Sequence, residues 1–313
     1  MGSISPSTTL DFYSSPHLAE HYDLLCAHEG AFFTDINVFY KELRGVYDRR
    51  INHDLAESQP EKKDEYAQSL AVVDVGTGTG RALFELIQRT RTASPPMNLT
   101  CAHFLGFDLS PHMVARAART RDIAAAAIGK LDWRCASALK LDAVLAESGL
   151  SDGQVDLLIF ADGGFLHLET EAQARQFLSL VARALRARSG RAVLAITNQA
   201  SVQEGTDLSY HDASGEKVQE YSSVEFPGLV YRNRLAGFHQ DGAVQESTYQ
   251  FEVWRRRKGE EDELVESCWT KLKGRAWSDA EVQALITACP GLKLIETAQP
   301  DRLQTFFIVS AES

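Results

Sequence analysis

A glycine-rich turn is the strongest candidate for chemistry in this sequence. Residues 73–80 read VDVGTGTG, an apolar run that passes through three glycines into a helical pattern. Glycines let the backbone approach a ligand closely, and the first N–H groups of the next helix are free to bind it. The alternative is a tight turn without a ligand. The dinucleotide-binding fingerprint has its third glycine at the sixth position, whereas Gly80 is at the fifth and Arg81 at the sixth.

A carboxylate follows the next apolar run, in the segment GFDLSPHM at residues 106–113. The two oxygens of Asp108 can accept hydrogen bonds from both hydroxyls of a ribose. The alternative is that Asp108 caps the following helix, but Ser110 fits the N-cap position better because Pro111 suits the first turn.

Two further polar residues follow the apolar run at 155–160. Asp162 and His167 lie where a parallel strand is expected to end, and ligands gather at that edge of an open α/β sheet. We expect them to orient or deprotonate a nucleophile as candidate catalytic residues. The alternatives are that Asp162 caps a turn and that His167 is a buried histidine with its hydrogen bonds satisfied.

Alternating strand and helix patterns position these residues. Strands are expected at 72–75, 100–107, 131–135, 155–160 and 192–197, with helices at 81–89, 111–120 and 170–187 between them. A helix at 279–288 and strands at 292–297 and 305–309 complete the pattern. This order predicts an α/β fold: a Rossmann-like, seven-stranded, mostly parallel sheet with helices on both faces.

The remaining segments are expected to cover this sheet. Residues 11–55 show helical periodicity, 199–228 read as a long polar loop, and 229–238, 244–255 and 263–273 read as an antiparallel β meander. We therefore predict a helical cover (1–55), a ligand-binding domain (56–198 and 276–313) and an inserted substrate cap (199–275). Self-association of the cap into a homodimer is one hypothesis.

The two motifs at this spacing resemble those of class I methyltransferases that use S-adenosylmethionine (SAM). The small-molecule enzymes are the most similar, namely glycine and sarcosine N-methyltransferases and amino-sugar N,N-dimethyltransferases. The resemblance is good over 71–197, looser over 11–55 and only architectural over 229–310. It implies SAM as the cofactor, with Asp108 at the ribose. It places the following residues at the rest of the cofactor: Asp74, Gly76, Thr77, Gly78, Gly80, Leu109, Met113 and Ala161.

The adenine contact and the N-terminal helix are two further parts of the resemblance. Ala136 occupies the place where relatives carry an acidic residue for the adenine, so Ser137 or a backbone carbonyl is expected to bind adenine instead. The segment AEHYD at 19–23 is similar to an N-terminal helix that folds over the cofactor in small-molecule enzymes. The resemblance implies that Tyr22 approaches the methionine end, and the alternative is that Tyr22 fills a core.

Composition narrows the partners. The formal net charge of −11 argues against nucleic acid and anionic membranes as partners, and favours a small-molecule substrate. The five cysteines are scattered and form no CxxC pair, so we expect neither a disulfide framework nor a metal site. Free cysteines of this kind favour a cytoplasmic location. We also expect no membrane span.

These features predict a methyltransferase that moves a methyl group from SAM to an N or O nucleophile of a metabolite. We expect the enzyme to act in specialised biosynthesis. Two alternatives stay open. One is an enzyme of this fold that uses SAM without methyl transfer, in a rearrangement or cyclisation. The other is a non-catalytic binding protein on this fold.

Overall fold

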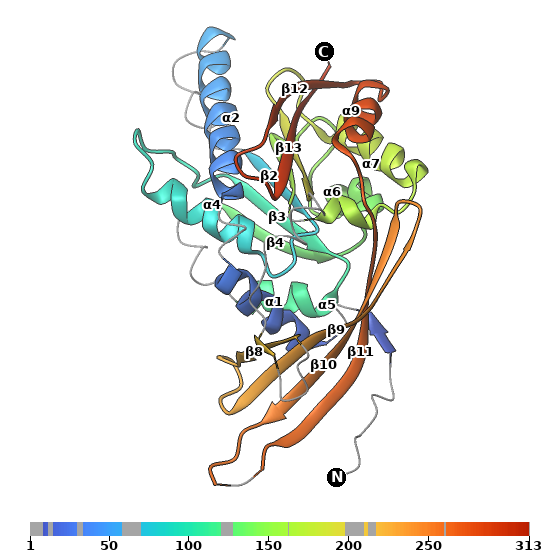
Figure 1. The fold of residues 1–313 in the computed structure, drawn as a ribbon. Coiled ribbons are helices and arrows are strands. Elements are labelled where there is room, and N and C mark those ends of the chain that lie inside the picture. The colour runs from blue at the N-terminus through green and yellow to red at the C-terminus, as the bar shows by residue number, and fades with distance from the viewer. Residues whose placement is uncertain are drawn as a thin grey trace. The chain divides into compact units, whose positions relative to one another are not determined.

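The computed structural model describes residues 9–11, 15–29, 34–57, 70–119, 128–161, 163–197, 210–211, 217–259 and 261–312 (Figure 1). The chain divides into two compact units. Residues 32–198 and 277–313 form one, called here the Rossmann-like unit. Residues 1–31 and 199–276 form the other, called here the insert unit.

The Rossmann-like unit is built on the predicted seven-stranded sheet. Its strand order is β12-β13-β6-β5-β2-β3-β4. The five strands from β6 to β4 are parallel, and β13 and β12 are antiparallel additions at the β6 edge. The strands are β2 (Ala71–Val75), β3 (His103–Asp108), β4 (Lys130–Cys135), β5 (Leu157–Phe160), β6 (Arg191–Thr197), β12 (Leu292–Ala298) and β13 (Gln304–Ala311).

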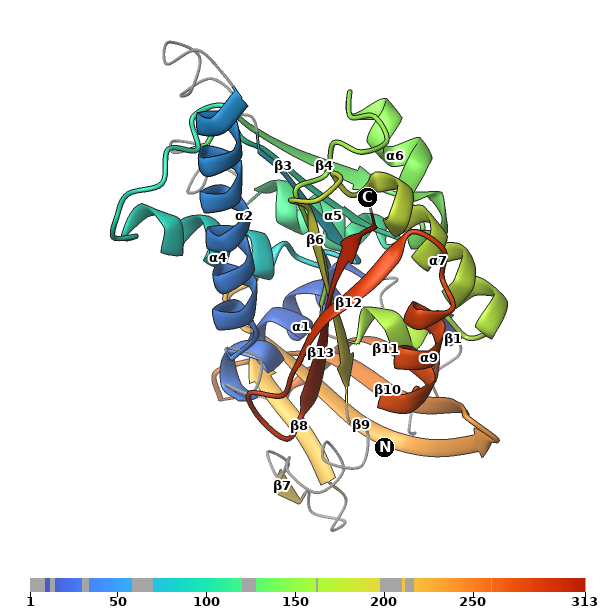
Figure 2. The same cartoon turned by 90° about the horizontal axis from the view of Figure 1, so that it is seen from above.

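Helices cover both faces of this sheet, as Figure 2 shows. One core lies against α2 and α4 and contains Phe39, Leu83 and Phe104; the other lies against α6, α7 and α9 and contains Phe177 and Phe307. Strands β2 and β5 are buried along their whole length, which explains their continuous apolar runs. The helices are α2 (Asp35–Glu57), α4 (Arg81–Arg91), α5 (Pro111–Arg119), α6 (Leu141–Glu147), α7 (Glu171–Ala184) and α9 (Asp279–Thr287).

The sequence around two of these helices contains strong start signals. Thr170 and Gln173 form a capping box at α7, and Ser278 and Glu281 form another at α9. In each, the hydroxyl of the cap residue accepts the backbone N–H of the third helical residue. The side chain of that third residue in turn accepts the backbone N–H of the cap residue. Both helices begin within one residue of their predicted starts at 170 and 279.

The insert unit is a second sheet, more extensive than the predicted meander. Its strand order is β1-β11-β10-β9-β8-β7, and β1 joins β11 in parallel while the other pairs are antiparallel. Its strands are β1 (Thr9–Asp11), β7 (Tyr210–His211), β8 (Lys217–Ser222), β9 (Leu229–Asp241), β10 (Val244–Arg255) and β11 (Glu263–Arg275).

One expectation about a connecting segment was wrong. The stretch 199–228 is not one long loop, because β7 and β8 lie within it; β8 was missed because its two buried residues, Val218 and Tyr221, face opposite sides of the strand. The expected helical stretch 11–55 is confirmed by two helices, α1 (Pro16–Glu29) and α2, although its first residue ends β1. Helix α1 belongs to the insert unit and α2 to the Rossmann-like unit.

A buried carboxylate holds α1 on the sheet of the insert unit. Glu20 is fully buried and accepts hydrogen bonds from the Tyr231 hydroxyl at 2.5 Å, the Ser223 hydroxyl at 2.7 Å and the N–H groups of Val224 and Glu225 at 2.8 and 2.7 Å. Burial raises the pKa of Glu20, but these hydrogen bonds outweigh burial and bring it below its usual value. The group is therefore ionised, and it fixes α1 to the β8–β9 connection.

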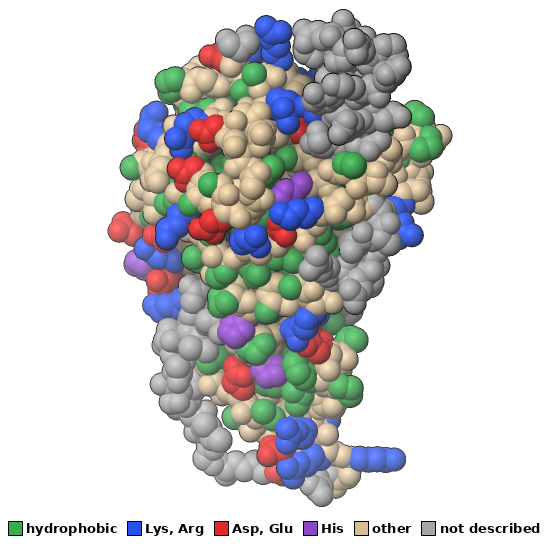
Figure 3. Space-filling view, turned by 180° about the vertical axis from the view of Figure 1, so that it is seen from behind, with side chains coloured by type: hydrophobic (Ala, Val, Ile, Leu, Met, Phe, Trp, Pro, Cys, Tyr) green, Lys and Arg blue, Asp and Glu red, His purple; other side chains and the backbone are tan. Residues whose placement is uncertain are grey.

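Charged side chains of both signs are interspersed on the face in Figure 3, so the acidic excess is not gathered into one area there. No helix in the described ranges is long and apolar enough to cross a membrane. The described residues also contain no group of three or more His, Cys, Asp or Glu side chains placed to hold a metal ion.

Candidate cofactor site

The glycine-rich turn connects the end of β2 to the start of α4 within the Rossmann-like unit. Gly76, Gly78 and Gly80 have φ values of 63°, 56° and 87°, in the left-handed region where a side chain is strained. The Thr77 N–H donates to the Phe107 carbonyl at 3.0 Å, which joins the turn to the end of β3. The backbone path of the turn therefore requires glycine at these three positions.

Trp133 on β4 packs under this turn and was not singled out from the sequence. A Cβ added to Gly80 would lie 2.7 Å from both Phe84 and Trp133, and one added to Gly106 would lie 2.3 Å from Trp133. The indole N–H of Trp133 is buried and has no hydrogen-bond partner in the described part of the chain. The available signal was a large aromatic residue, Trp133, beside Gly106 on the neighbouring strand and Gly80 in the turn before α4.

Asp108 is held by the backbone that surrounds it. One oxygen accepts the Gly78 N–H at 2.9 Å and the other accepts the Ser110 N–H at 2.8 Å. Each carboxylate oxygen has a second lone pair, so two further donors can bind. Burial raises the pKa of Asp108, while the backbone N–H groups and the charge of His167 lower it. Ser110 accepts the Met113 N–H at 3.3 Å, which confirms Ser110 as the N-cap of α5.

Asp74 is the most deeply buried carboxylate of the turn, with 1% of its surface exposed. One oxygen accepts the Thr77 hydroxyl at 2.7 Å, and the other, Oδ1, has no hydrogen-bond partner in the described ranges. Burial raises the pKa of Asp74 to about 7; Thr77 and the charge of Arg81 lower it, and Asp108 and Asp35 raise it. An unpartnered carboxylate oxygen in this position favours a cationic ligand.

The residues of this turn fit SAM, which carries a ribose diol and a methionine end with an ammonium and a sulfonium. The two remaining lone pairs of Asp108 suit the diol, and Asp74 Oδ1 suits a cation. The left-handed glycines leave backbone without side chains between these two carboxylates.

The end of β4 meets the end of β3 where the adenine contacts were predicted. The Ala136 N–H donates to the Asp108 carbonyl at 2.9 Å, and Ser137 caps the short helix η4 (Ala138–Lys140) by accepting the Leu139 N–H at 3.3 Å. Leu109 is 73% exposed, whereas Met113 is buried. The structure therefore brings Ala136 and Ser137 to the Asp108 strand end, and their adenine contacts stay predictions.

The segment after β5 contains the other predicted residues. Ala161 is buried, and its carbonyl accepts the Gly164 N–H at 2.9 Å in the turn that begins the short helix η5 (Gly164–His167). His167 is exposed at the end of η5, so the alternative of a buried histidine is wrong. Its charge acts on Asp108. Asp162 lies outside the described residues, and Tyr22 lies on α1 in the insert unit.

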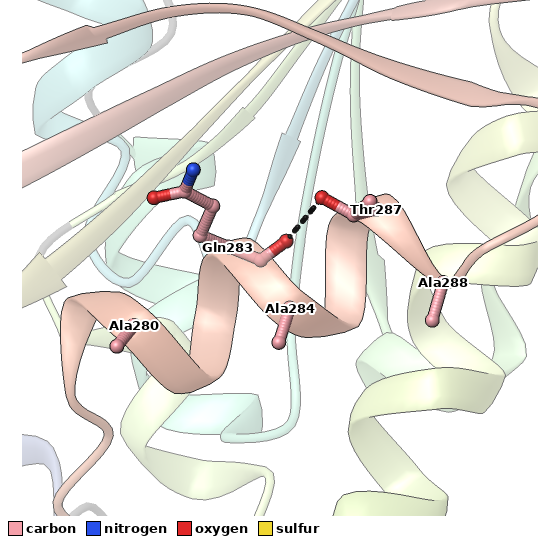
Figure 4. Close-up of a pocket in the computed structure, with 5 residues that line it drawn as sticks. All are labelled: Ala280, Gln283, Ala284, Thr287 and Ala288. Atoms are coloured by element: carbon pink, nitrogen blue, oxygen red, sulfur yellow. Dashed lines mark hydrogen bonds between the residues drawn. The ribbon is translucent and has the colours of Figure 1, made fainter.

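A hollow of about 520 Å³ lies on the exposed face of α9, away from all predicted residues (Figure 4). The Thr287 hydroxyl donates to the Gln283 carbonyl at 2.8 Å there. Its lining contains no ionisable side chain, so it supplies no candidate for catalysis; it consists of Ala280, Gln283, Ala284, Thr287 and Ala288.

Comparison with known proteins identifies the type of domain. The family model described as a methyltransferase domain matches residues 72–188. The N-methyltransferase FrzE of a Cladobotryum species is 28% identical over 258 residues, which are 82% of this chain and 82% of that protein.

A solved structure shows the same fold. The CcbJ methyltransferase of Streptomyces caelestis superposes with a TM-score of 0.50 at 13% identity, over 86% of this chain and 98% of that chain. DesVI of Streptomyces venezuelae gives a TM-score of 0.49 at 15% identity, over 89% and 98% of the two chains. The domain match over residues 72–188 and the related enzyme indicate a SAM-dependent methyltransferase, and the two carboxylates of the glycine-rich site fit its cofactor.

Proposed function

We propose that this enzyme transfers the methyl group of SAM to an amine nitrogen of a small-molecule metabolite. The observation that carries the choice of nitrogen is the similarity to an N-methyltransferase along 82% of both chains. An amine also needs little from the protein, because its lone pair is free once it is unprotonated and no base must remove a proton first.

We further propose roles for the predicted residues. Asp108 accepts from the ribose hydroxyls through its two remaining lone pairs, while Asp74 stabilises the methionine end through Oδ1. Gly76, Gly78 and Gly80, with Thr77, form the backbone path past the nucleoside. Ala136, Ser137, Leu109 and Met113 border the adenine, Ala161 borders the methyl group, and Tyr22 covers the methionine end.

Catalysis in this proposal is mainly orientation. Bound SAM would supply an activated methyl group, whose carbon would bond to the acceptor nitrogen as the carbon–sulfur bond breaks and S-adenosylhomocysteine leaves. The residues of the chain hold the donor, align the acceptor and exclude competing water, and such positioning accounts for several kcal/mol of rate enhancement. His167 and Asp162 are proposed to orient the amine or to take its proton after transfer. The sheet of the insert unit is proposed to contribute acceptor-binding surface and to support a homodimer.

The test is a screen of paired acceptors with radiolabelled SAM. Each primary or secondary amine is compared with the alcohol of the same skeleton, and labelled product is quantified together with S-adenosylhomocysteine. We expect label in amines only, with one S-adenosylhomocysteine per methyl transferred. Label in the alcohols alone contradicts the nitrogen assignment. An altered acceptor without label or S-adenosylhomocysteine supports the rearrangement alternative instead.

A further inference from the structure

A cluster of carboxylates shares one guanidinium beside the glycine-rich turn. Asp35, the first residue of α2, is fully buried, and both of its oxygens are bound by Arg81, the first residue of α4. The two contacts are 3.2 Å to Nη1 and 2.5 Å to Nη2. Glu85, one helical turn further along α4, also lies 3.6 Å from Arg81.

The same guanidinium acts on Asp74. Charged groups from three elements affect the pKa of Asp74: Arg81 from α4, Asp35 from α2 and Asp108 from β3. Arg81 lowers the pKa of Asp74, whereas both carboxylates raise it. Arg81 thus contacts Asp35 and Glu85 and acts on the pKa of Asp74, and its contacts with Asp35 are shorter than its contact with Glu85.

This arrangement leaves an excess of negative charge around a buried, half-satisfied carboxylate. Asp74 is 1% exposed and its Oδ1 has no partner in the part of the chain that the structure describes, so water compensates this excess poorly. Charges interact more strongly where water is excluded. A ligand with an additional positive charge is therefore favoured over the same ligand without it.

We propose that Asp35 is a specificity-determining residue: by neutralising Arg81 it keeps the cofactor site negative, so that the site prefers the sulfonium of SAM to the neutral thioether of S-adenosylhomocysteine. Asp35 acts through Arg81 and Asp74 and is thus a positioning residue. The consequence is easier exchange of spent cofactor for fresh cofactor. This inference concerns the methyl donor only and is independent of the acceptor proposed above.

The experiment measures dissociation constants of three ligands by calorimetry, for the full chain and for Asp35→Asn. The ligands are SAM, S-adenosylhomocysteine and sinefungin, in which a protonatable amine replaces the sulfonium. The affinities are compared at pH 8, where Asp74 is ionised in both proteins. Asp35→Asn frees the guanidinium charge, so binding of SAM and sinefungin is expected to weaken about 10-fold while binding of S-adenosylhomocysteine changes less than 3-fold. At pH 6.5, the protons released on SAM binding are also expected to decrease, because a freed Arg81 keeps Asp74 ionised beforehand.

Two further variants keep the inference testable. Glu85→Gln removes a half-exposed partner of Arg81 and provides a test if Asp35→Asn fails to fold. It is expected to lower the preference for SAM over S-adenosylhomocysteine, given by the ratio of their dissociation constants, by about 2-fold. Asp142→Asn breaks an exposed ion pair with Arg183 and is the matched control, with no change expected. Equal weakening of all three ligands, or an unchanged ratio in a folded Asp35→Asn or in Glu85→Gln, overturns the proposal. Loss of SAM binding by the unmodified chain would contradict the cofactor assignment instead.

Discussion

At the residue level, the two carboxylates proposed to bind SAM have different surroundings. Asp108 is already bound by two backbone N–H groups, so its orientation is fixed before any ligand is present. Asp74 has a free oxygen and a pKa raised by burial to about 7. Asp108 therefore contributes a preformed geometry, whereas Asp74 contributes a charge that depends on pH.

Asp108→Ala is expected to lose SAM binding by at least 100-fold. The change removes the acceptor proposed for both ribose hydroxyls, and charge-assisted hydrogen bonds of this kind contribute about 1.5–3 kcal/mol each. Calorimetry with SAM measures the effect. Asp108→Asn is the control, because one carbonyl oxygen remains and a smaller loss is expected. Binding that is unchanged in Asp108→Ala would remove the main support for the proposed ribose contact.

Asp74→Asn is expected to stabilise the ligand-free protein at pH 8 by up to about 4 kcal/mol and to weaken SAM binding. The folded pKa lies near 7, above the value of 3.8 for the free side chain, so the folded state holds the proton more tightly. The free energy of unfolding of the unmodified chain should then decrease as pH rises from about 4 to 7.

Urea unfolding between pH 3.5 and 8 checks this expectation for both proteins. The two stability profiles should converge below about pH 4 and separate towards pH 7, because only the unmodified chain contains the titrating group. The affinity of the unmodified chain for SAM should decrease below pH 7, since a protonated Asp74 no longer attracts a cation. Parallel stability profiles would contradict the raised pKa.

At the element level, close packing adds to backbone conformation as a reason for glycine at position 80. Gly80 and Gly149 have similar positive φ values of 87° and 81°, but only Gly80 has neighbours in the space of a Cβ. Trp133 and Phe84 occupy that space. Strand β4 thus supports the turn through Trp133, although none of its residues was predicted to contact the cofactor.

Gly80→Ala is expected to destabilise the protein by about 2–5 kcal/mol, the sum of a left-handed alanine and overpacking against Trp133. Gly149→Ala is the matched control and should cost about 1–2 kcal/mol, because nothing lies within 4 Å of its added Cβ. Denaturant unfolding gives both values. Equal costs for the two variants would show that Trp133 does not restrict this position.

Glu20→Gln is expected to destabilise the insert unit by about 2–4 kcal/mol, because four hydrogen bonds converge on the buried carboxylate and an amide cannot accept all of them. Fluorescence of Trp254 and Trp269, which lie in this unit, follows its unfolding. Glu246→Gln, which breaks a surface pair with Lys271, is the control. Unchanged stability in Glu20→Gln would show that the carboxylate does not fix α1.

The sequence predicted the parts of the fold that depend on local patterns. The buried runs of β2 and β5, the glycine-rich turn and the Ser110 cap all involve neighbouring residues, and the structure confirms them. Pairings over long sequence distances were not predictable from periodicity. The Asp35–Arg81 pair, the packing of Trp133 under Gly106 and the parallel pairing of β1 with β11 each join segments whose proximity only the fold creates.

The whole molecule consists of two units that are continuous in space but not in sequence. The insert unit combines the N-terminal 31 residues with residues 199–276, and the Rossmann-like unit combines 32–198 with 277–313. Each has its own apolar core: Tyr231, Phe251 and Val253 pack with Leu18 in the insert unit. Two cores of this kind can unfold in separate steps.

SAM at 100 times its dissociation constant is expected to stabilise the Rossmann-like unit by about 2.7 kcal/mol and to leave the insert unit less affected. The tryptophans separate the two signals: Trp133 and Trp277 report the first unit, and Trp254 and Trp269 the second. A Trp254→Phe/Trp269→Phe variant and a Trp133→Phe/Trp277→Phe variant therefore follow one unit each during thermal unfolding. Equal shifts of both midpoints would indicate one cooperative molecule.

The parallel pairing of β1 with β11 has a practical consequence for anyone who shortens or tags this protein. Thr9–Asp11 lie beside Trp269–Lys271 and occupy that edge of the sheet. A truncation that begins at residue 15 would leave this side of β11 with unpaired backbone groups, and such edges recruit strands from other molecules. Purification handles are safer after Glu312 than before Thr9, and loss of solubility on N-terminal trimming would reflect an uncovered strand rather than a missing catalytic group.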